Sequence, residues 1–309
     1  MTVTDPDVGP PPGSDGDEDG AVTPELERSA ERAKNRLGFL YALPAYAYLI
    51  LFFAAPLIIV GVYSFATRPP SGGVPDLAGW NLDAYSKLAE PLVRTIAWRS
   101  FWYAVLTTVL CLLLGYPFAL YLVTRAPRYR NLLLVLVLIP FWSNFLVRTY
   151  AWRVLLGSDG PWSQLTQALG FGESRLLFTP TAVIIGLVYG FLPFMILPLY
   201  ASIERLDWRL VEASRDLYAN GWQAFRRVIW PLSRPGVIAG SILVFIPSLG
   251  AYVTPEILGG AKTTLLGSYI VNQFLSARDW PFGSALSFVV MLVMLAATIV
   301  YFREGGRNL

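Results

Sequence analysis

Residues 206–231 read LDWRLVEASRDLYANGWQAFRRVIWP, a polar segment placed between two long apolar runs. At helical spacing, one stripe of this segment is apolar and consists of Leu206, Leu210, Ala213 and Leu217. A neighbouring face repeats the spacing with charges of both signs: Arg205, Arg209, Glu212 and Asp216. A helix that lies on lipid would be basic, so the mixed charge favours docking into a groove of a soluble partner.

The composition is that of an integral membrane protein. Of the 309 residues, 55% are hydrophobic and only 15% are charged, which is too apolar for a soluble domain of this size. A helix needs about 20 apolar residues to cross the bilayer. Six runs predict an all-α membrane protein with six transmembrane helices, at residues 39–63, 101–123, 132–155, 182–200, 237–253 and 284–301. We expect Pro247 to interrupt the fifth of them.

The residue inventory excludes several kinds of chemistry. The chain has no histidine and a single cysteine, Cys111, which lies inside the second predicted span. Histidine-based catalysis, histidine metal ligation and an internal disulfide are therefore excluded, and Cys111 is expected to be a small buried apolar residue. We expect no catalytic residue, no metal site and no nucleic-acid partner for this chain.

The N-terminal segment differs from the rest. Residues 1–24 contain six acidic residues among prolines and glycines, which predicts a disordered acidic tail ahead of a transmembrane domain at residues 25–309. A tail of this kind that binds a basic partner is the alternative. No cleaved signal is expected, because the first apolar run starts near residue 39 and is too long for a signal core.

Basic residues predict the orientation in the membrane. The segments before the first span, between spans two and three, between spans four and five, and after the sixth hold 15 lysines and arginines, against seven in the opposite connections. Loops rich in basic residues stay in the cytoplasm. Both termini and residues 206–231 are therefore predicted to be cytoplasmic.

Residues 206–231 also carry signals for the ends of helices. Asp207 can cap a helix that begins near Trp208, and Asn220–Gly221 offers a left-handed turn that would end it. A second short helix would then run from Trp222 to Trp230, and Pro231 should stop or bend it. The segment is thus predicted to be a compact helix-turn-helix.

The same segment resembles the cytoplasmic loop of the membrane permeases of binding-protein-dependent ABC importers. That loop reads Glu-Ala-Ala, three residues, Gly, nine residues, Ile, one residue, Leu-Pro, and the positions on this frame here are Glu212, Ala213, Ser214, Val228 and Pro231. The chain departs from the frame at Ser214, at Trp230 and at Tyr218, which stands where the family has glycine. We expect Gly221 to supply the missing flexibility, so that the turn moves to Asn220–Gly221.

The resemblance implies that the loop couples transport to a partner ATPase. The coupling residues would be Glu212, Ala213, Ser214, Asp216, Tyr218, Gly221 and Pro231. It also implies a second related permease, a dimer of ATPase subunits that binds ATP and Mg, and an extracytoplasmic substrate-binding protein, with no cofactor bound by this chain. The alternative for Glu212 is a simple ion pair with Arg209, or with a neighbour of Asp216, on a solvated face.

Several further segments resemble the first permease subunit of the spermidine/putrescine importers. They include LGYPFA at 114–119, IPFWSN at 139–144, FTPTAVIIGLVY at 178–189, LPFMILPLY at 192–200 and RDWPFG at 278–283. The resemblance implies a translocation subunit for polyamines in a bacterial inner membrane. A permease for another solute, such as ferric iron, sulfate or an amino-acid derivative, and a secondary transporter of a cationic solute are the alternatives.

A polycation requires carboxylates or aromatic faces along its route. The candidates are Trp142, Asn144, Tyr189, Tyr252 and Glu256. Packing is the alternative for the aromatic residues, contact with a binding protein for Glu256, and contact with another subunit for Asn144. Arg148 follows Asn144 by four residues, and we expect it near the outer boundary because an arginine repels a polycation.

Overall fold

The computed structural model describes residues 41–77, 79–125, 128–170, 172, 175–305, and the acidic segment 1–24 lies outside these residues. Contacts divide the chain into two compact units, residues 1–59 and residues 60–309. In the first unit the described residues belong to an apolar helix, Tyr41–Tyr63, which continues into the second unit and contains the π-helical turn η1 (Ile50–Ala54). This helix confirms the first predicted span over its described part.

The described part of the second unit consists of helices joined by turns and loops. Its longer helices are α4 (Pro91–Thr124), α5 (Arg130–Trp142), α6 (Phe145–Leu155), α8 (Pro180–Glu204), α11 (Trp230–Leu249) and α13 (Trp280–Gly305). Shorter elements are α2 (Ala55–Tyr63), which begins in the first unit, α3 (Asp83–Ser86), η2 (Lys87–Ala89), α7 (Pro161–Ala168), α9 (Trp208–Asp216), α10 (Gly221–Ala224), η3 (Phe225–Ile229), η4 (Pro255–Gly259), η5 (Gly260–Lys262) and α12 (Leu266–Leu275). Pairing between extended backbone segments is limited, among the described residues, to two isolated β-bridges.

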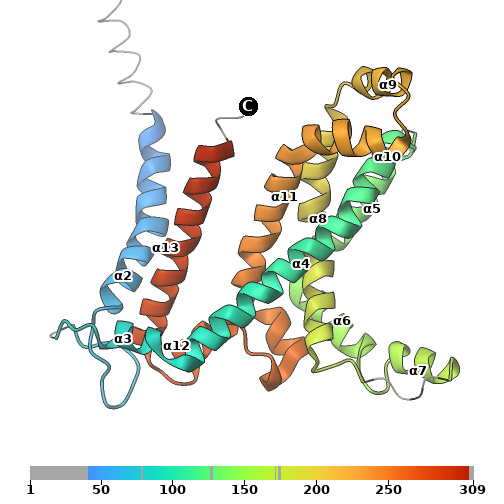
Figure 1. Ribbon diagram of the computed structural model, residues 1–309. Helices are drawn as coiled ribbons and strands as arrows, with labels where there is room; N and C mark the ends of the chain where they lie inside the picture. The colour runs from blue at the N-terminus through green and yellow to red at the C-terminus, as the bar shows by residue number, and fades with distance from the viewer. Residues whose placement is uncertain (1–40, 78, 126–127, 171, 173–174, 306–309) are drawn as a thin grey trace, which may run out of the picture. The chain divides into compact units, whose positions relative to one another are not determined.

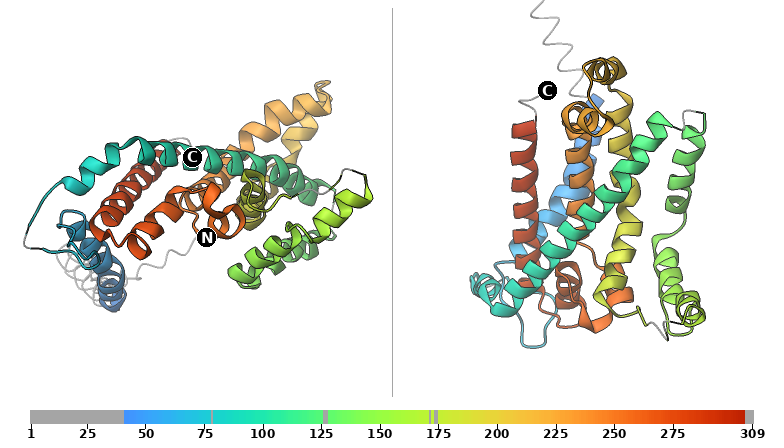
Figure 2. Two further views of the ribbon diagram at one scale, coloured as in Figure 1. Left: turned by 90° about the horizontal axis from the view of Figure 1, so that it is seen from below. Right: turned by 45° about the vertical axis from the view of Figure 1, so that its right-hand side comes forward.

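Three helices, α4, α8 and α11, pack against one another and form the core of the second unit (Figures 1 and 2). Their shared apolar cluster consists of Cys111, Tyr116, Ala119, Met195, Leu199, Ile203 and Val244. Small residues allow the helices to approach closely, and a Cβ on Gly240 would lie 2.8 Å from the sulfur of Met195. The elements α9 and α10 lie at one end of this core, and α12 and α7 lie at the other (Figure 1).

Two predicted spans are longer in the structure than their apolar runs. The second span, predicted at residues 101–123, is the 34-residue helix α4, which starts at Pro91. Proline suits the first helical position because the N–H that it lacks would have no partner within the helix there. The fourth, predicted at 182–200, extends over Pro180–Glu204, and its start is fixed by Thr179, whose hydroxyl accepts the N–H of Ala182.

The third predicted span, residues 132–155, is wrong as a single straight helix. It is divided into α5 and α6, whose axes differ by 92°. The break occurs because Ser143 is extended, with ψ of 151°, and the side chain of Asn144 accepts the N–H of Leu146 to start a new helix. The apolar pattern continues across the break, so hydropathy alone does not reveal it.

The fifth predicted span, residues 237–253, also needs correction. The helix α11 passes through Pro247 without interruption and ends at Leu249, with Gly250 as its C-cap. Among the described residues, four helices are long and apolar enough to cross a membrane, or five if α5 and α6 form one broken span. The sixth predicted span, 284–301, lies within α13, which is not among these four helices, so the number six stays a prediction.

Candidate functional site

The helix α9 lies in the middle of the segment that resembles the importer loop, and both of its ends are well defined. The side chain of Asp207 accepts the N–H of Arg209 at 3.0 Å, which confirms the predicted cap and the start at Trp208. At the other end, the N–H of Tyr218 donates to the carbonyl of Arg215 at 2.9 Å, and the N–H of Ala219 donates to that of Ser214 at 3.1 Å. This pair of hydrogen bonds is the Schellman motif, and Tyr218 has the left-handed conformation that the motif requires, with φ of 61°.

The prediction that the turn moves to Asn220–Gly221 is therefore wrong. Asn220 has an extended conformation and caps α10, where its side chain accepts the N–H of Gln223 at 2.8 Å. The side chain of Gln223 accepts the N–H of Asn220 in return, which completes a capping box. Gly221 is the first residue of α10 and has no positive φ, so the left-handed residue is Tyr218, at the position of the family glycine.

The prediction that Pro231 stops the second helix is wrong, although the helical path does change direction between α10 and α11 (Figures 1 and 2). The helical path continues from α10 through the π-helical turn η3 (Phe225–Ile229) into α11, in which Pro231 is at the N-terminal end. A π-turn widens the helix by one residue and changes which carbonyl faces which N–H. The missing donor and the ring of Pro231 are tolerated because they fall at this change of hydrogen-bonding pattern.

Two faces of α9 have opposite environments. Val211 is buried in an apolar cluster with Ala224 and Ile229, which attaches α9 to α10 and η3. On the outward side, Leu210 is 49% exposed and Leu217 is 82% exposed. Of the stripe that the sequence predicts as apolar, Leu210, Ala213 and Leu217 are thus exposed, whereas Leu206 packs against the same cluster as Val211, which lies outside that stripe.

The other predicted coupling residues lie around this helix. Ala213, Glu212 and Asp216 are exposed, and the Ser214 hydroxyl donates to the carbonyl of Val211 at 2.7 Å. Glu212 makes no salt bridge with any residue that the structure describes, so the alternative of an ion pair with Arg209 is wrong.

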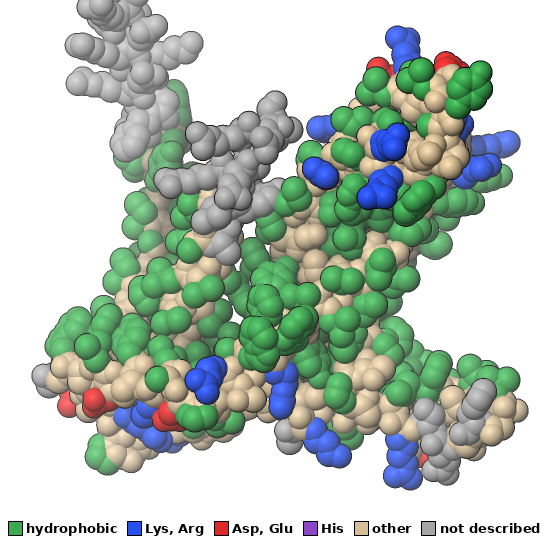
Figure 3. All heavy atoms as spheres, in the orientation of Figure 1, with side chains coloured by type: hydrophobic (Ala, Val, Ile, Leu, Met, Phe, Trp, Pro, Cys, Tyr) green, Lys and Arg blue, Asp and Glu red, His purple; other side chains and the backbone are tan. Residues whose placement is uncertain are grey.

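Glu212 borders a hollow of about 520 Å³ between α9 and the end of α4. The cations on its walls are Arg125, at the C-cap of α4, and Arg215, in the last turn of α9. In the space-filling view, hydrophobic side chains around α9 and α10 lie among basic ones, with acidic side chains at the tip (Figure 3). Hydrophobic and basic side chains are therefore mixed on this surface.

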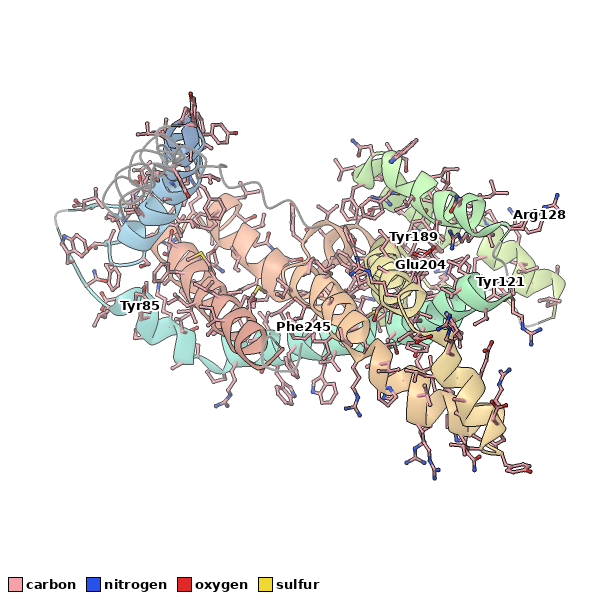
Figure 4. All side chains as sticks on the ribbon, turned by 90° about the horizontal axis from the view of Figure 1, so that it is seen from above. Tyr85, Tyr121, Arg128, Tyr189, Glu204 and Phe245 are labelled. Atoms are coloured by element: carbon pink, nitrogen blue, oxygen red, sulfur yellow. The ribbon has the colours of Figure 1, made fainter. Side chains whose placement is uncertain are left out.

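The predicted cargo-contacting residues do not form one cluster. Trp142, at the end of α5, is 87% exposed, and Asn144 is the cap of α6. Tyr252 lies in the connection after α11, and Glu256 is an exposed residue of η4. Tyr189, on α8, packs its ring against that of Trp152 with centroids 5.3 Å apart, and Figure 4 shows it on the same helix as Glu204.

Tyr189 is the one predicted pathway residue that lines a small hollow between α6, α8 and η4. Arg148 lines the same hollow, with its guanidinium 5.0 Å from the ring centroid of Phe141 and 5.8 Å from that of Phe145. Its Nε is buried and has no hydrogen-bond partner among the described residues. The cation is thus held by aromatic faces rather than by a carboxylate.

The sequence reasoning missed a charged cluster at the α12 end. The Asp279 carboxylate is buried, and its Oδ2 lies 2.8 Å from the Lys87 Nζ and 3.4 Å from the Arg68 Nη1. Its Oδ1 accepts the N–H of Phe282 and so caps α13. The acid directly ahead of Trp280-Pro281 is a helix-start signal that could have been recognised, whereas its pairing with a lysine 192 residues away could not.

Comparison with known proteins gives consistent results. Residues 99–303 match the family described as the binding-protein-dependent transport system inner membrane component. The spermidine/putrescine transport system permease protein PotB of Haemophilus influenzae is 45% identical over 262 residues, which cover 84% of this chain and 91% of that protein. PotB of Escherichia coli K12 is 44% identical over 261 residues, 84% of this chain and 94% of the relative.

A solved structure supports the fold. A chain of a bacterial alginate ABC transporter, in complex with an alginate pentasaccharide-bound periplasmic protein, superposes with a TM-score of 0.68. The match covers 89% of this chain and 97% of that chain at 17% sequence identity.

Proposed function

Because this chain belongs to the family of binding-protein-dependent transport system inner membrane components, we propose that it is the translocation subunit of an ATP-driven importer of polyamines. The observation that carries the choice of cargo is the 45% identity, over 84% of the chain, to a permease named for spermidine and putrescine. The cargo crosses the membrane through this subunit and a second, related permease. An extracytoplasmic binding protein delivers it.

ATP is hydrolysed, with Mg, on a dimer of partner ATPase subunits rather than on this chain. The sequence contains no G-x-x-x-x-G-K-[ST] phosphate loop, which supports this division of labour. The excess of basic residues in the connections that include residues 206–231 favours a cytoplasmic location for α9 and for both termini. The ATPase and α9 are then on the same side of the membrane.

The helix α9 is the contact for the ATPase in this proposal. Its outward side presents Leu210 and Leu217 to solvent, and Glu212 has no internal partner within the described residues. Its inward residue Val211 packs against η3, which leads directly into α11. A displacement of α9 by the ATPase would therefore act on a helix of the three-helix core.

Transport in proteoliposomes tests the function. The permease pair and the ATPase encoded beside it are reconstituted with the cognate binding protein, and uptake of radiolabelled spermidine and putrescine is measured with ATP inside. We expect saturable uptake that requires ATP. Uptake driven by an ion gradient without ATP would identify a secondary transporter, and ATP-driven uptake of sulfate or ferric iron instead of polyamines would refute the choice of cargo.

Charge reversal at Glu212 tests the coupling role. Glu212→Lys should lower transport-stimulated ATPase activity at least about 10-fold, the size expected when a central interface residue is lost, without reducing membrane insertion. The control is Asp159→Lys, an exposed acid just ahead of α7, at the end of the core opposite α9. Unchanged coupling in the Glu212 variant would refute docking through this face.

The pathway residues need a separate measurement. If Glu256 contacts cargo, Glu256→Gln raises the KM for spermidine at saturating binding protein. If Glu256 contacts the binding protein, the same variant instead raises the concentration of loaded binding protein that gives half-maximal uptake. Tyr189→Phe distinguishes packing from cargo contact for Tyr189, because it keeps the ring against Trp152 and removes only the hydroxyl group.

A further inference from the structure

Tyr218 adopts a backbone conformation that does not suit its residue type. Its φ of 61° lies in the left-handed region, where the Cβ of a bulky residue is close to the neighbouring carbonyl oxygen. Glycine is the usual residue at this position of a Schellman motif, since it has no Cβ. The two hydrogen bonds of the motif form all the same, so α9 ends here at the expense of local strain.

Nothing within the described part of the chain compensates for this strain. The side chain of Tyr218 is 98% exposed, and it has no hydrogen bond, ring contact or ion pair with another described residue. Glycine at position 218 would therefore make the folded subunit more stable than tyrosine does. Strain of this kind is concentrated at functional sites, where the side chain acts on something outside the fold.

The surroundings of Tyr218 indicate the chemistry of that partner. Leu217 is 82% exposed and Trp222 is 67% exposed, so the ring belongs to an apolar surface. Exposed arginines outnumber acids near this surface: Arg215, Arg226 and Arg227 against Asp216. In Figure 3 hydrophobic and basic side chains lie together at this end of the chain. A complementary surface would be an apolar pocket with an acidic rim.

We propose that Tyr218 is an anchor residue that selects the ATPase subunit. Its ring enters an apolar pocket with an acidic rim on that subunit, and its phenolic O–H donates a hydrogen bond to an acceptor inside the pocket. Tyrosine suits this role because it buries a large rigid surface while losing few rotamers. The proposal rests on the docking of α9 proposed above, and it adds the residue that distinguishes one ATPase partner from another.

Three substitutions separate backbone strain from recognition. Tyr218→Gly removes the ring and relieves the strain, Tyr218→Asn removes the ring at a residue type that tolerates positive φ, and Tyr218→Phe removes only the O–H. Each permease pair is placed in lipid nanodiscs, and the dissociation constant for the ATPase encoded beside this chain is measured by fluorescence anisotropy. The midpoint of thermal unfolding is measured on the same samples. Tyr129→Asn is the control, because Tyr129 is an exposed tyrosine outside the segment 206–231.

The glycine and asparagine variants should bind the ATPase at least about 10-fold more weakly, and the phenylalanine variant should lie between them and the unmodified protein. The unfolding midpoint of Tyr218→Gly should rise by roughly 2–4 °C. Wild-type affinity in Tyr218→Gly, or a lower unfolding midpoint, would overturn the proposal, the latter because it would make Tyr218 a structural residue. A wild-type permease that binds no ATPase would instead refute the proposed function.

Discussion

The buried carboxylate of Asp279 offers a test of how burial determines the strength of an ion pair. Its side chain is 6% exposed and makes two cationic contacts, with Lys87 at 2.8 Å and with Arg68 at 3.4 Å. Asp279→Asn removes the charge and retains a good helix cap, since asparagine accepts the N–H of Phe282 equally well. The substitution thus isolates the electrostatic contribution from the cap.

The expected loss of stability follows from the geometry. A hydrogen bond to a charged group contributes about 1.5–3 kcal/mol, and the lower end applies here because the Lys87 side chain is 38% exposed and partly screened. The contact with Arg68 is longer and its side chain is 47% exposed, so it adds a few tenths of a kcal/mol, on the order expected for a surface pair. We expect Asp279→Asn to cost about 2 kcal/mol. Asp279→Ala should cost about 3 kcal/mol, because it also removes the cap.

The chain contains a matched control. Arg130 and Glu204 are also 2.8 Å apart, but their side chains are 44% and 38% exposed, so Glu204→Gln should cost less than about 1 kcal/mol. Reversible unfolding in mixed micelles, followed by tryptophan fluorescence, gives the three free energies. Hydrogen exchange at Gly73, whose N–H donates to the carbonyl of Arg278 at 2.8 Å, reports whether the loop held by Asp279 opens. Equal costs for Asp279→Asn and Glu204→Gln would refute the argument from burial.

Three further predictions concern the core of α4, α8 and α11. Gly236→Ala should destabilise the protein by about 1–3 kcal/mol in thermal unfolding, because its Cβ would lie 2.7 Å from a carbonyl oxygen of α8. Gly221→Ala should not, because no atom lies within 4 Å of the Cβ it would add. Similar unfolding midpoints for the two variants would contradict this prediction. Cys111, which is 0% exposed, should resist maleimide in the folded protein and react after unfolding, as intact-mass measurement would show. Tyr116→Phe should cost about 0.5–1.5 kcal/mol, since it removes the buried 2.7 Å hydrogen bond between the Tyr116 and Ser233 hydroxyls; an unchanged unfolding free energy would contradict that role.

Hydropathy predicted the helical class and the approximate position of the spans, because burial in lipid requires long apolar runs whatever the tertiary structure. It did not predict the 92° break between α5 and α6, because the residues on both sides of Ser143 and Asn144 are equally apolar. The break depends on the side chain of Asn144, whose oxygen accepts the N–H of Leu146. Local hydrogen bonding of this kind competes with helix continuation at little cost in apolar burial, so a pattern of apolar residues cannot detect it.

At the turn after α9, by contrast, the sequence carried a clear signal, but that signal predicted the wrong residues. Residue preference favours Asn220–Gly221 as the left-handed turn, yet Tyr218 has the positive φ. The helix starts at Trp208 because of Asp207, and Val211 packs with Ala224 and Ile229 of the elements that follow. The chain must therefore turn back between α9 and α10, and Tyr218 adopts the left-handed conformation there although its side chain disfavours it. Tertiary packing therefore determines the position of the turn, and the unfavourable residue that remains there is the reason to look for a function in its side chain.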